Sequence, residues 1–190
     1  MNRFLFFIFL FLLIGCDSIN KKNGEYTVNK LEIRDNTPIF LEGNKYDRQN
    51  GTIFSFDEVK GKVLLLDFWN TNCAPCIRQH PMVVKLKKKI NSPNFKVITV
   101  SIDNDREKWY NFVEKNNWEE INIHIGYKPK DTLYKILSPK PHIYNKKGKQ
   151  VEVYPASIPA YFLIDKNLNI YKIDSLESKK IVNQINNLLK

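Results

Sequence analysis

The chain has 190 residues, 43% of them hydrophobic, which is enough to bury one ordinary core and leaves no need for a second domain. Its formal net charge at pH 7 is +10, yet the lysines are scattered among acidic residues as well as clustered at 87–89. Such a surface suits anionic lipid headgroups or an acidic client, and a solvated lysine-rich surface explains it equally well.

The first 15 residues have the layout of a secretory signal peptide. Arg3 precedes an apolar run from Phe4 to Ile14, which is too short for a membrane-spanning helix of roughly 20 apolar residues. The run ends at Gly15 and Cys16, and residues 13–16 resemble the bacterial lipoprotein box, in which the cysteine is acylated and becomes the first residue of the mature protein. A plain signal peptide with an incidental cysteine is the alternative.

Acylation of Cys16 has consequences for the rest of the chain. It anchors the protein to a bacterial membrane, outside the cytoplasm and facing the periplasm where there is one, because the acyl chains bury many methylenes at about 0.8 kcal/mol each. Nucleic acid is then not an expected partner. Since the chain has three cysteines, one pair is left for a disulfide. Residues 16–36 are the lipidated start and a flexible tether, and residues 37–190 form the domain.

The first half of the domain predicts a βαβ unit. Residues 53–56 form a weak strand, and residues 63–69 are apolar on both faces, as in a strand at the centre of a covered sheet. A helix over 77–90, with Pro81 as an expected kink, leads to a second apolar strand at 96–102. The two apolar strands should lie parallel, with a right-handed crossover.

The second half predicts a helix, a hairpin and a last helix. Asp103 or Asn104 is expected to cap the first of these helices. Strands at 161–165 and 168–173 are separated by a two-residue connection typical of an antiparallel hairpin, and Ser175 starts the last helix. The order is βαβα followed by ββα, which resembles the thioredoxin-like α/β fold, a central mixed β-sheet flanked by helices on both faces.

Cys73 and Cys76 stand two residues apart, directly after the buried strand and at the start of a helix. One helical turn brings their sulfurs within bonding reach, and the helix N-terminus stabilises the thiolate of the first cysteine. Cys73 is therefore the expected nucleophile, and Cys76 the shielded resolving thiol. Pro75 suits this first turn, where no backbone N–H is needed.

Two metal sites are alternatives for this cysteine pair. Structural zinc would need two more ligands, and His80, His124 and His142 show no ligand spacing with one another. A copper chaperone would use Cys73, Cys76 and His80. Exported copper chaperones on this fold usually separate their cysteines by three residues, so no metal is expected. The redox-active disulfide is then the redox group, with no further cofactor.

The segment from Asp67 to Cys76 resembles the active-site segment of thioredoxins and, together with the lipoprotein pattern, the TlpA/ResA group of extracytoplasmic thiol-disulfide oxidoreductases. In that group a carboxylate six residues before the first cysteine, buried beneath the disulfide, shuttles the proton of the resolving thiol. Asp67 occupies the matching position. Burial should raise its pKa toward the working pH. A strand-end residue satisfied by a neighbouring hydroxyl is the alternative role for Asp67.

The resemblance covers residues 37–190 and implies which of them meet a client protein. Trp69 matches the family's first tryptophan, which packs beneath the active-site loop, whereas Asn72 replaces the family's second aromatic residue. The expected client-binding residues are Trp69, Ala74, Pro75 and Ile158.

The family's other marker is a cis-proline that faces the disulfide. Pro159, preceded by Ile158 and followed by the apolar strand at 161–165, matches this marker. A cis X-Pro bond costs about 0.5 to 1 kcal/mol, and here it would expose a strand edge beside the thiols. Pro141 begins a weaker echo of the same pattern.

The resemblance implies an oxidoreductase that reduces disulfides in exported proteins, such as apocytochromes c, receives electrons from a membrane donor and acts as a monomer. A copper-binding chaperone and a redox-inactive binding lipoprotein are the alternatives. The sequence does not fix the direction of electron flow, because potentials on this fold run from about -270 to about -120 mV. Residues 128–156 form an insertion relative to a minimal thioredoxin, and their place before Pro159 leads us to expect a role in client choice.

Overall fold

The computed structural model describes residues 41–177 and 179–190. The predicted signal peptide, the lipidated Cys16 and the tether up to residue 36 lie outside these described residues. Within them, no helix combines the length and the apolar character that a membrane crossing requires.

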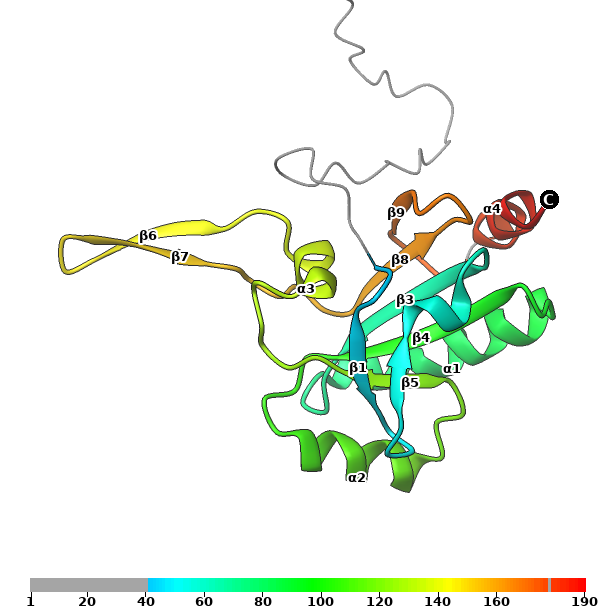
Figure 1. Cartoon of the computed structure of the whole chain (residues 1–190), viewed down its shortest axis with the longest axis horizontal. Helices are drawn as coiled ribbons and strands as arrows, with labels where there is room; N and C mark the ends of the chain where they lie inside the picture. Colours follow the sequence, from blue (N-terminus) through cyan, green and yellow to red (C-terminus); the bar gives the residue numbers. More distant parts are fainter. Residues whose placement is uncertain (1–40, 178) are drawn as a thin grey trace, which may run out of the picture.

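In the described part of the chain, a seven-stranded mixed sheet forms the centre of the domain (Figure 1). Its strands are β1 (Lys45–Arg48), β2 (Ile53–Ser55), β3 (Val63–Trp69), β4 (Phe95–Ser101), β5 (Ile121–His124), β8 (Ala160–Ile164) and β9 (Ile170–Ile173). They follow the order β2-β1-β5-β4-β3-β8-β9. The parallel pair β3 and β4, and the antiparallel pairs β3 with β8 and β8 with β9, confirm the predicted mixed sheet.

Helices cover both faces of this sheet, as predicted. They are the 3-10 turn η2 (Phe56–Val59), α1 (Ala74–Ile90), α2 (Arg106–Asn116), α3 (Thr132–Leu137) and α4 (Lys179–Leu189). Because side chains alternate along a strand, Leu65 of β3 joins α1 and α4 in one apolar cluster, while Leu64 and Leu66 join α3 and η2 in another. The two clusters therefore lie on opposite faces of the sheet.

Strand β3 leads into the candidate site and is buried along its whole length. Its neighbours on the two sides are β4 and β8, so both of its edges are hydrogen-bonded. Burial of each large apolar side chain stabilises the fold by about 1.5–3 kcal/mol. The position of the residues at the carboxyl end of β3, where α1 begins, is fixed by this surrounding structure.

The structure corrects two helix starts. The N-cap of α2 is Asp105, whose carboxylate accepts the backbone N–H of Lys108, and neither Asp103 nor Asn104 caps this helix. The last helix, α4, begins at Lys179 rather than at Ser175. The hydroxyl of Ser175 instead accepts the backbone N–H of Glu177, which closes a turn before the helix.

The connection between β8 and β9 is longer than the predicted two residues. Asp165 organises it, because its carboxylate accepts the backbone N–H groups of Asn167 and Asn169 and the hydroxyl of Tyr171. Leu168 takes a left-handed position there, with φ of 65°. Side-chain bonding by an aspartate of this kind is a common way to stabilise a tight turn.

The predicted insertion at 128–156 contains α3 and a two-stranded hairpin, β6 (His142–Lys146) and β7 (Lys149–Val153). The hairpin extends away from the sheet (Figure 1), and all residues of its two strands are exposed. The sequence analysis did not predict β1, β5 or α3. Pro81 lies inside α1, which continues to Ile90.

Candidate active site

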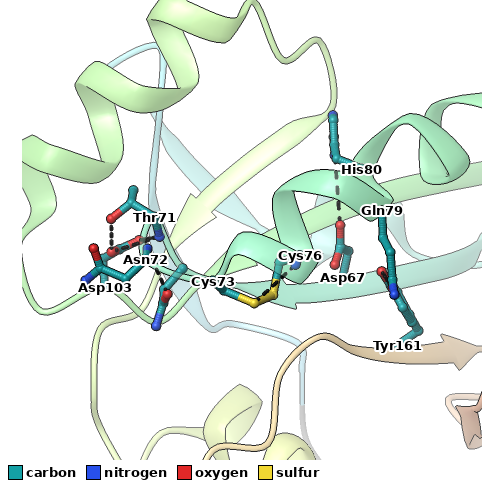
Figure 2. The surroundings of a disulfide bond; sticks show 10 residues. Asp67, Thr71, Asn72, Cys73, Cys76, Gln79, His80, Asp103 and Tyr161 are labelled. Atoms are coloured by element: carbon teal, nitrogen blue, oxygen red, sulfur yellow. Dashed lines mark hydrogen bonds and ion pairs between the residues drawn. A yellow bond between two sulfur atoms is a disulfide. The ribbon is translucent and has the colours of Figure 1, made fainter.

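The cysteine pair lies where β3 ends and α1 begins (Figure 2). Cys73 and Cys76 form a disulfide with their Cα atoms 5.2 Å apart, as the two-residue spacing predicts. Cys73 is the N-cap of α1, and its sulfur accepts the backbone N–H of Cys76 at 3.2 Å. A thiolate at Cys73 therefore meets both a hydrogen-bond donor and the positive end of the helix dipole.

The two cysteines differ in solvent exposure, and so do the predicted client-binding residues. Cys73 is 8% exposed and Cys76 is 3% exposed, which fits a nucleophile and a shielded resolving thiol. Ala74 and Pro75 are exposed on the first turn of α1. Trp69 is fully buried in an apolar cluster with both cysteines. Trp69 therefore supports the cysteines from beneath, and its direct contact with a client stays a prediction.

The Ile158–Pro159 peptide bond is cis, as predicted. Ile158 packs against the apolar cluster that holds both cysteines, and β8 follows directly after Pro159. Since Ala160 of β8 lies opposite Phe68 of β3, this proline is held beside the carboxyl end of β3. Among the described residues this is the one cis bond, so the echo of the pattern at Pro141 does not share the geometry.

The loop before Cys73 is held by Asp103, which lies two residues after the end of β4 and is 5% exposed. The carboxylate of Asp103 accepts the backbone N–H of Thr71 at 3.1 Å and the hydroxyl of Thr71 at 2.6 Å. The hydroxyl of Ser101 donates to the same carboxylate at 2.8 Å. The sequence analysis treated Asp103 as a helix cap and missed this role, which ties the active-site loop to the sheet.

Asp67 lies on β3 beneath the part of α1 that carries Cys76 and His80 (Figure 2). Its side chain is 4% exposed, and its Oδ1 atom has no hydrogen-bond partner in the described part of the chain. The nearby hydroxyl of Tyr161 donates to Gln79 at 2.9 Å and leaves Asp67 without a hydroxyl donor. Burial raises the pKa of Asp67, and the neighbouring His80 opposes this rise.

Further charged groups continue from Asp67. His80 Nδ1 lies 4.0 Å from Asp67 Oδ2, and His80 Nε2 lies 3.4 Å from Glu120 Oε2. Lys87 donates to Glu120 Oε1 at 3.2 Å. The sequence analysis considered His80 only as a copper ligand and missed Glu120, because no local spacing relates this acid to the cysteines. The one available signal was that His80 lies one helical turn after Cys76.

In the described residues, no group of three or more histidine, cysteine or acidic side chains is placed to hold a metal ion. His80, which the copper alternative needs beside both sulfurs, faces two carboxylates instead. The copper alternative therefore has no observation of this structure in its favour.

Comparison with known proteins agrees with this geometry. Residues 35–189 match the Redoxin family. A curated relative, the thiol-disulfide oxidoreductase ResA of Bacillus thuringiensis subsp. konkukian, is 28% identical over 158 residues, which are 80% of this chain and 87% of the relative.

Solved structures share the fold. The thioredoxin domain of a thiol-disulfide oxidoreductase from Bacteroides vulgatus has a TM-score of 0.59 at 18% identity, covering 86% of this chain and 100% of that chain. A thiol:disulfide interchange protein of the thioredoxin family from Chlorobium tepidum has a TM-score of 0.55 at 21% identity, covering 80% and 95%. At these identities the likeness shows the thioredoxin-like fold.

Replacing Asp103 by alanine should destabilise the domain more than replacing Asp105 by alanine. D103A leaves the donors of Thr71 and Ser101 without their acceptor, at about 1–3 kcal/mol for each buried group. D105A removes one exposed helix cap, worth about 1 kcal/mol. Urea unfolding of both variants measures the two losses of free energy. Equal losses would contradict the assigned role of Asp103.

Proposed function

Since the chain belongs to the Redoxin family and is a thioredoxin-like thiol-disulfide oxidoreductase, we propose that it reduces disulfide bonds in exported proteins, with apocytochromes c as clients. The observation that carries the proposal is the Cys73–Cys76 pair at the N-terminus of α1, above the buried carboxylate of Asp67. A dithiol in this position has an activated nucleophile, a shielded second thiol and a nearby base.

In the first step, the thiolate of Cys73 attacks one sulfur of a client disulfide. A bond forms between Cys73 and the client, the client disulfide breaks, and the released client thiolate takes a proton from water. The backbone N–H of Cys76 and the helix N-terminus hold the attacking thiolate in its ionised form.

In the second step, the thiol of Cys76 passes its proton to the carboxylate of Asp67 and attacks the sulfur of Cys73. The mixed disulfide breaks, and the second client thiolate leaves and is protonated by water. Two electrons have then moved from the dithiol to the client, and the enzyme disulfide has formed. Asp67 suits the role of base because burial raises its pKa toward the working pH, where the carboxylate can both take up and release a proton.

The client is proposed to lie across two features beside the disulfide. One is the first turn of α1, with Ala74 and Pro75 at its surface. The other is the backbone of Ile158, which precedes the cis-proline Pro159 and is available to pair with an extended client segment.

The proposed site of action is the outer side of a bacterial membrane. The lipoprotein pattern at Cys16 supports a lipid anchor, and residues 17–36 then tether a monomeric domain to the bilayer. A membrane electron donor would return the disulfide to the dithiol after each turnover. The cysteine pair would be the only redox group, with no added cofactor.

Replacing Cys76 by serine should trap the first step. In C76S the mixed disulfide between Cys73 and a client has no resolving thiol, so covalent complexes accumulate. In C73S the nucleophile is absent and no complexes form. Each variant is incubated with oxidised insulin or an oxidised apocytochrome c, and mass spectrometry measures the covalent complexes. The wild-type protein should release either client and accumulate no complex. Equal trapping by C73S and C76S would contradict the assigned order.

The hairpin β6–β7 leads directly into the cis-proline segment. The backbone carbonyl of Tyr154, just after β7, accepts the hydroxyl of the buried Tyr134 at 3.1 Å, which fixes the base of the hairpin. Beyond this base the hairpin exposes large apolar side chains: Ile143, Tyr144, Val151 and Val153. An isolated two-stranded hairpin is only marginally stable in water. We propose that the hairpin gains its partner in the client and so selects it.

Replacing residues 142–153 by a short Gly-Ser link should separate client choice from exchange chemistry. The link spans adjacent backbone positions, because His142 lies opposite Val153, and it keeps Tyr154. The rate with oxidised glutathione should stay within about twofold, while the rate with a protein client should fall about tenfold, as for the loss of a modest contact surface. Stopped-flow fluorescence measures both rates. Unchanged activity toward the protein client would remove the idea.

A further inference from the structure

A continuous row of charged side chains leads from the carboxylate beneath the disulfide to the protein surface. Asp67 contacts His80, His80 contacts Glu120, and Glu120 binds Lys87. The side chains of the first three are 4%, 7% and 2% exposed, whereas that of Lys87 is 40% exposed. One end of the row therefore lies at the disulfide and the other end lies in water.

The surface end opens into a depression. Lys87 and Glu120 both line a hollow of about 690 Å³, together with Arg48, Glu58 and Glu119. The row therefore reaches this hollow through Lys87, the most exposed of its four members. The Asp67 end is enclosed, because β3 is buried along its whole length.

Aromatic contacts fix the orientation of the His80 ring. Trp118 stacks on it with ring centroids 3.5 Å apart and an angle of 10° between the planes, and Trp69 lies against Trp118. The two ring nitrogens thereby face different acids, Nδ1 toward Asp67 and Nε2 toward Glu120. An imidazolium carries a proton on each ring nitrogen, which suits a group between two carboxylates.

The row also contains a concentration of unsatisfied atoms. Asp67 Oδ1, His80 Nδ1 and Glu120 Oε2 are all buried without a hydrogen-bond partner in the part of the chain that the structure describes. Buried polar atoms are rarely left in this state. Three in one row, next to a redox-active disulfide, show that charge attraction rather than well-formed hydrogen bonds holds these groups together.

The charged groups that face His80 come from several elements. Strand β3 contributes Asp67, the residue before β5 is Glu120, α1 contributes Lys87, and Tyr161 of β8 lies near Asp67. Burial alone would lower the pKa of His80, but the two carboxylates outweigh it and raise that pKa. Burial would likewise raise the pKa of Glu120, but His80 and Lys87 lower it to about 2. The row thus stabilises a proton on His80.

We propose that His80, held as an imidazolium between the two acids, is a positioning residue of the exchange reaction, which keeps Asp67 ionised so that it can act as the base for Cys76. This inference rests on the proposed role of Asp67 as the base for Cys76. The S–H bond of Cys76 breaks and an O–H bond forms on Asp67. Asp67 then returns the proton to water, and His80 keeps the protons on both of its ring nitrogens. No electrons move in these transfers, and Asp67 regains its charge.

The test follows the step that Cys76 performs. The reduced full chain, in mild detergent, is mixed with oxidised glutathione, and the mixed disulfide on Cys73 is followed from pH 5 to pH 9 by rapid acid quenching and mass spectrometry. In H80Q, Asp67 loses the adjacent cation, so its pKa rises. The pH at which the decay rate falls to half on the acid side should rise by about one unit, as expected for the loss of one opposite charge. The decay rate at pH 6 should fall about tenfold.

Two matched variants separate this effect from a structural one. E120Q keeps the shape of Glu120 and the whole of His80, but it removes the charge that stabilises the imidazolium. The midpoint of the pH profile should move in the same direction by a smaller amount. This variant therefore tests the role of His80 even where H80Q fails to fold. E107Q neutralises an exposed acid on the first turn of α2 and should leave the profile unchanged. Loosened packing would slow the decay at all pH values without moving the midpoint.

The outcomes distinguish the two levels of the account. In one outcome, the pH profile of the decay rate has the wild-type midpoint in both H80Q and E120Q, while D67N decays slowly. This outcome would overturn the role of His80 and leave that of Asp67 standing. Wild-type decay in D67N would overturn both roles. Failure of the wild-type protein to form any mixed disulfide would overturn the proposed function itself. The expected result is a shifted midpoint in H80Q and E120Q, and no further effect of H80Q when D67N is already present.

Discussion

Burial of the Asp67 carboxylate is the constraint on which the rest of the site depends. The strand that carries it is covered on both faces, so the ionised form has little solvation and needs an opposite charge nearby. His80 can supply that charge 4.0 Å away, and Glu120 in turn holds His80. Burial and an adjacent cation shift the pKa of Asp67 in opposite directions, so its proton affinity reflects both.

The scaffold explains why these groups meet. β3 places Asp67 in the centre of the sheet, and α1 begins just beyond its carboxyl end, so the cysteine pair and His80 follow one another on the same helix above the acid (Figure 2). The parallel neighbour β4 ends at the same edge, with Ser101 opposite Trp69. Asp103, two residues later, can therefore hold the loop before Cys73. Two strand ends and one helix start are enough to build the site.

Short-range patterns predict most of this scaffold. The apolar run of β3, the spacing of the cysteines and the proline before β8 lie within short windows, and the structure confirms the parallel βαβ unit, the disulfide and the cis bond. Strands β1 and β5 are short, and they are buried only through contacts with distant segments. No short sequence pattern predicts the role of Glu120 for the same reason, since its partner Lys87 is 33 residues away. The helix cap was misplaced because Asp103 is engaged by Thr71, which leaves Asp105 to cap α2.

The central claim of the account is that electrons flow from the dithiol to the client. The most direct test is the reduction potential of the Cys73–Cys76 pair in the full chain, kept in mild detergent and equilibrated against glutathione or dithiothreitol buffers. A reductant of exported proteins predicts a value below about -230 mV, on the thioredoxin side of the scale. A value near -120 mV would contradict the account, because such a disulfide oxidises folding proteins instead.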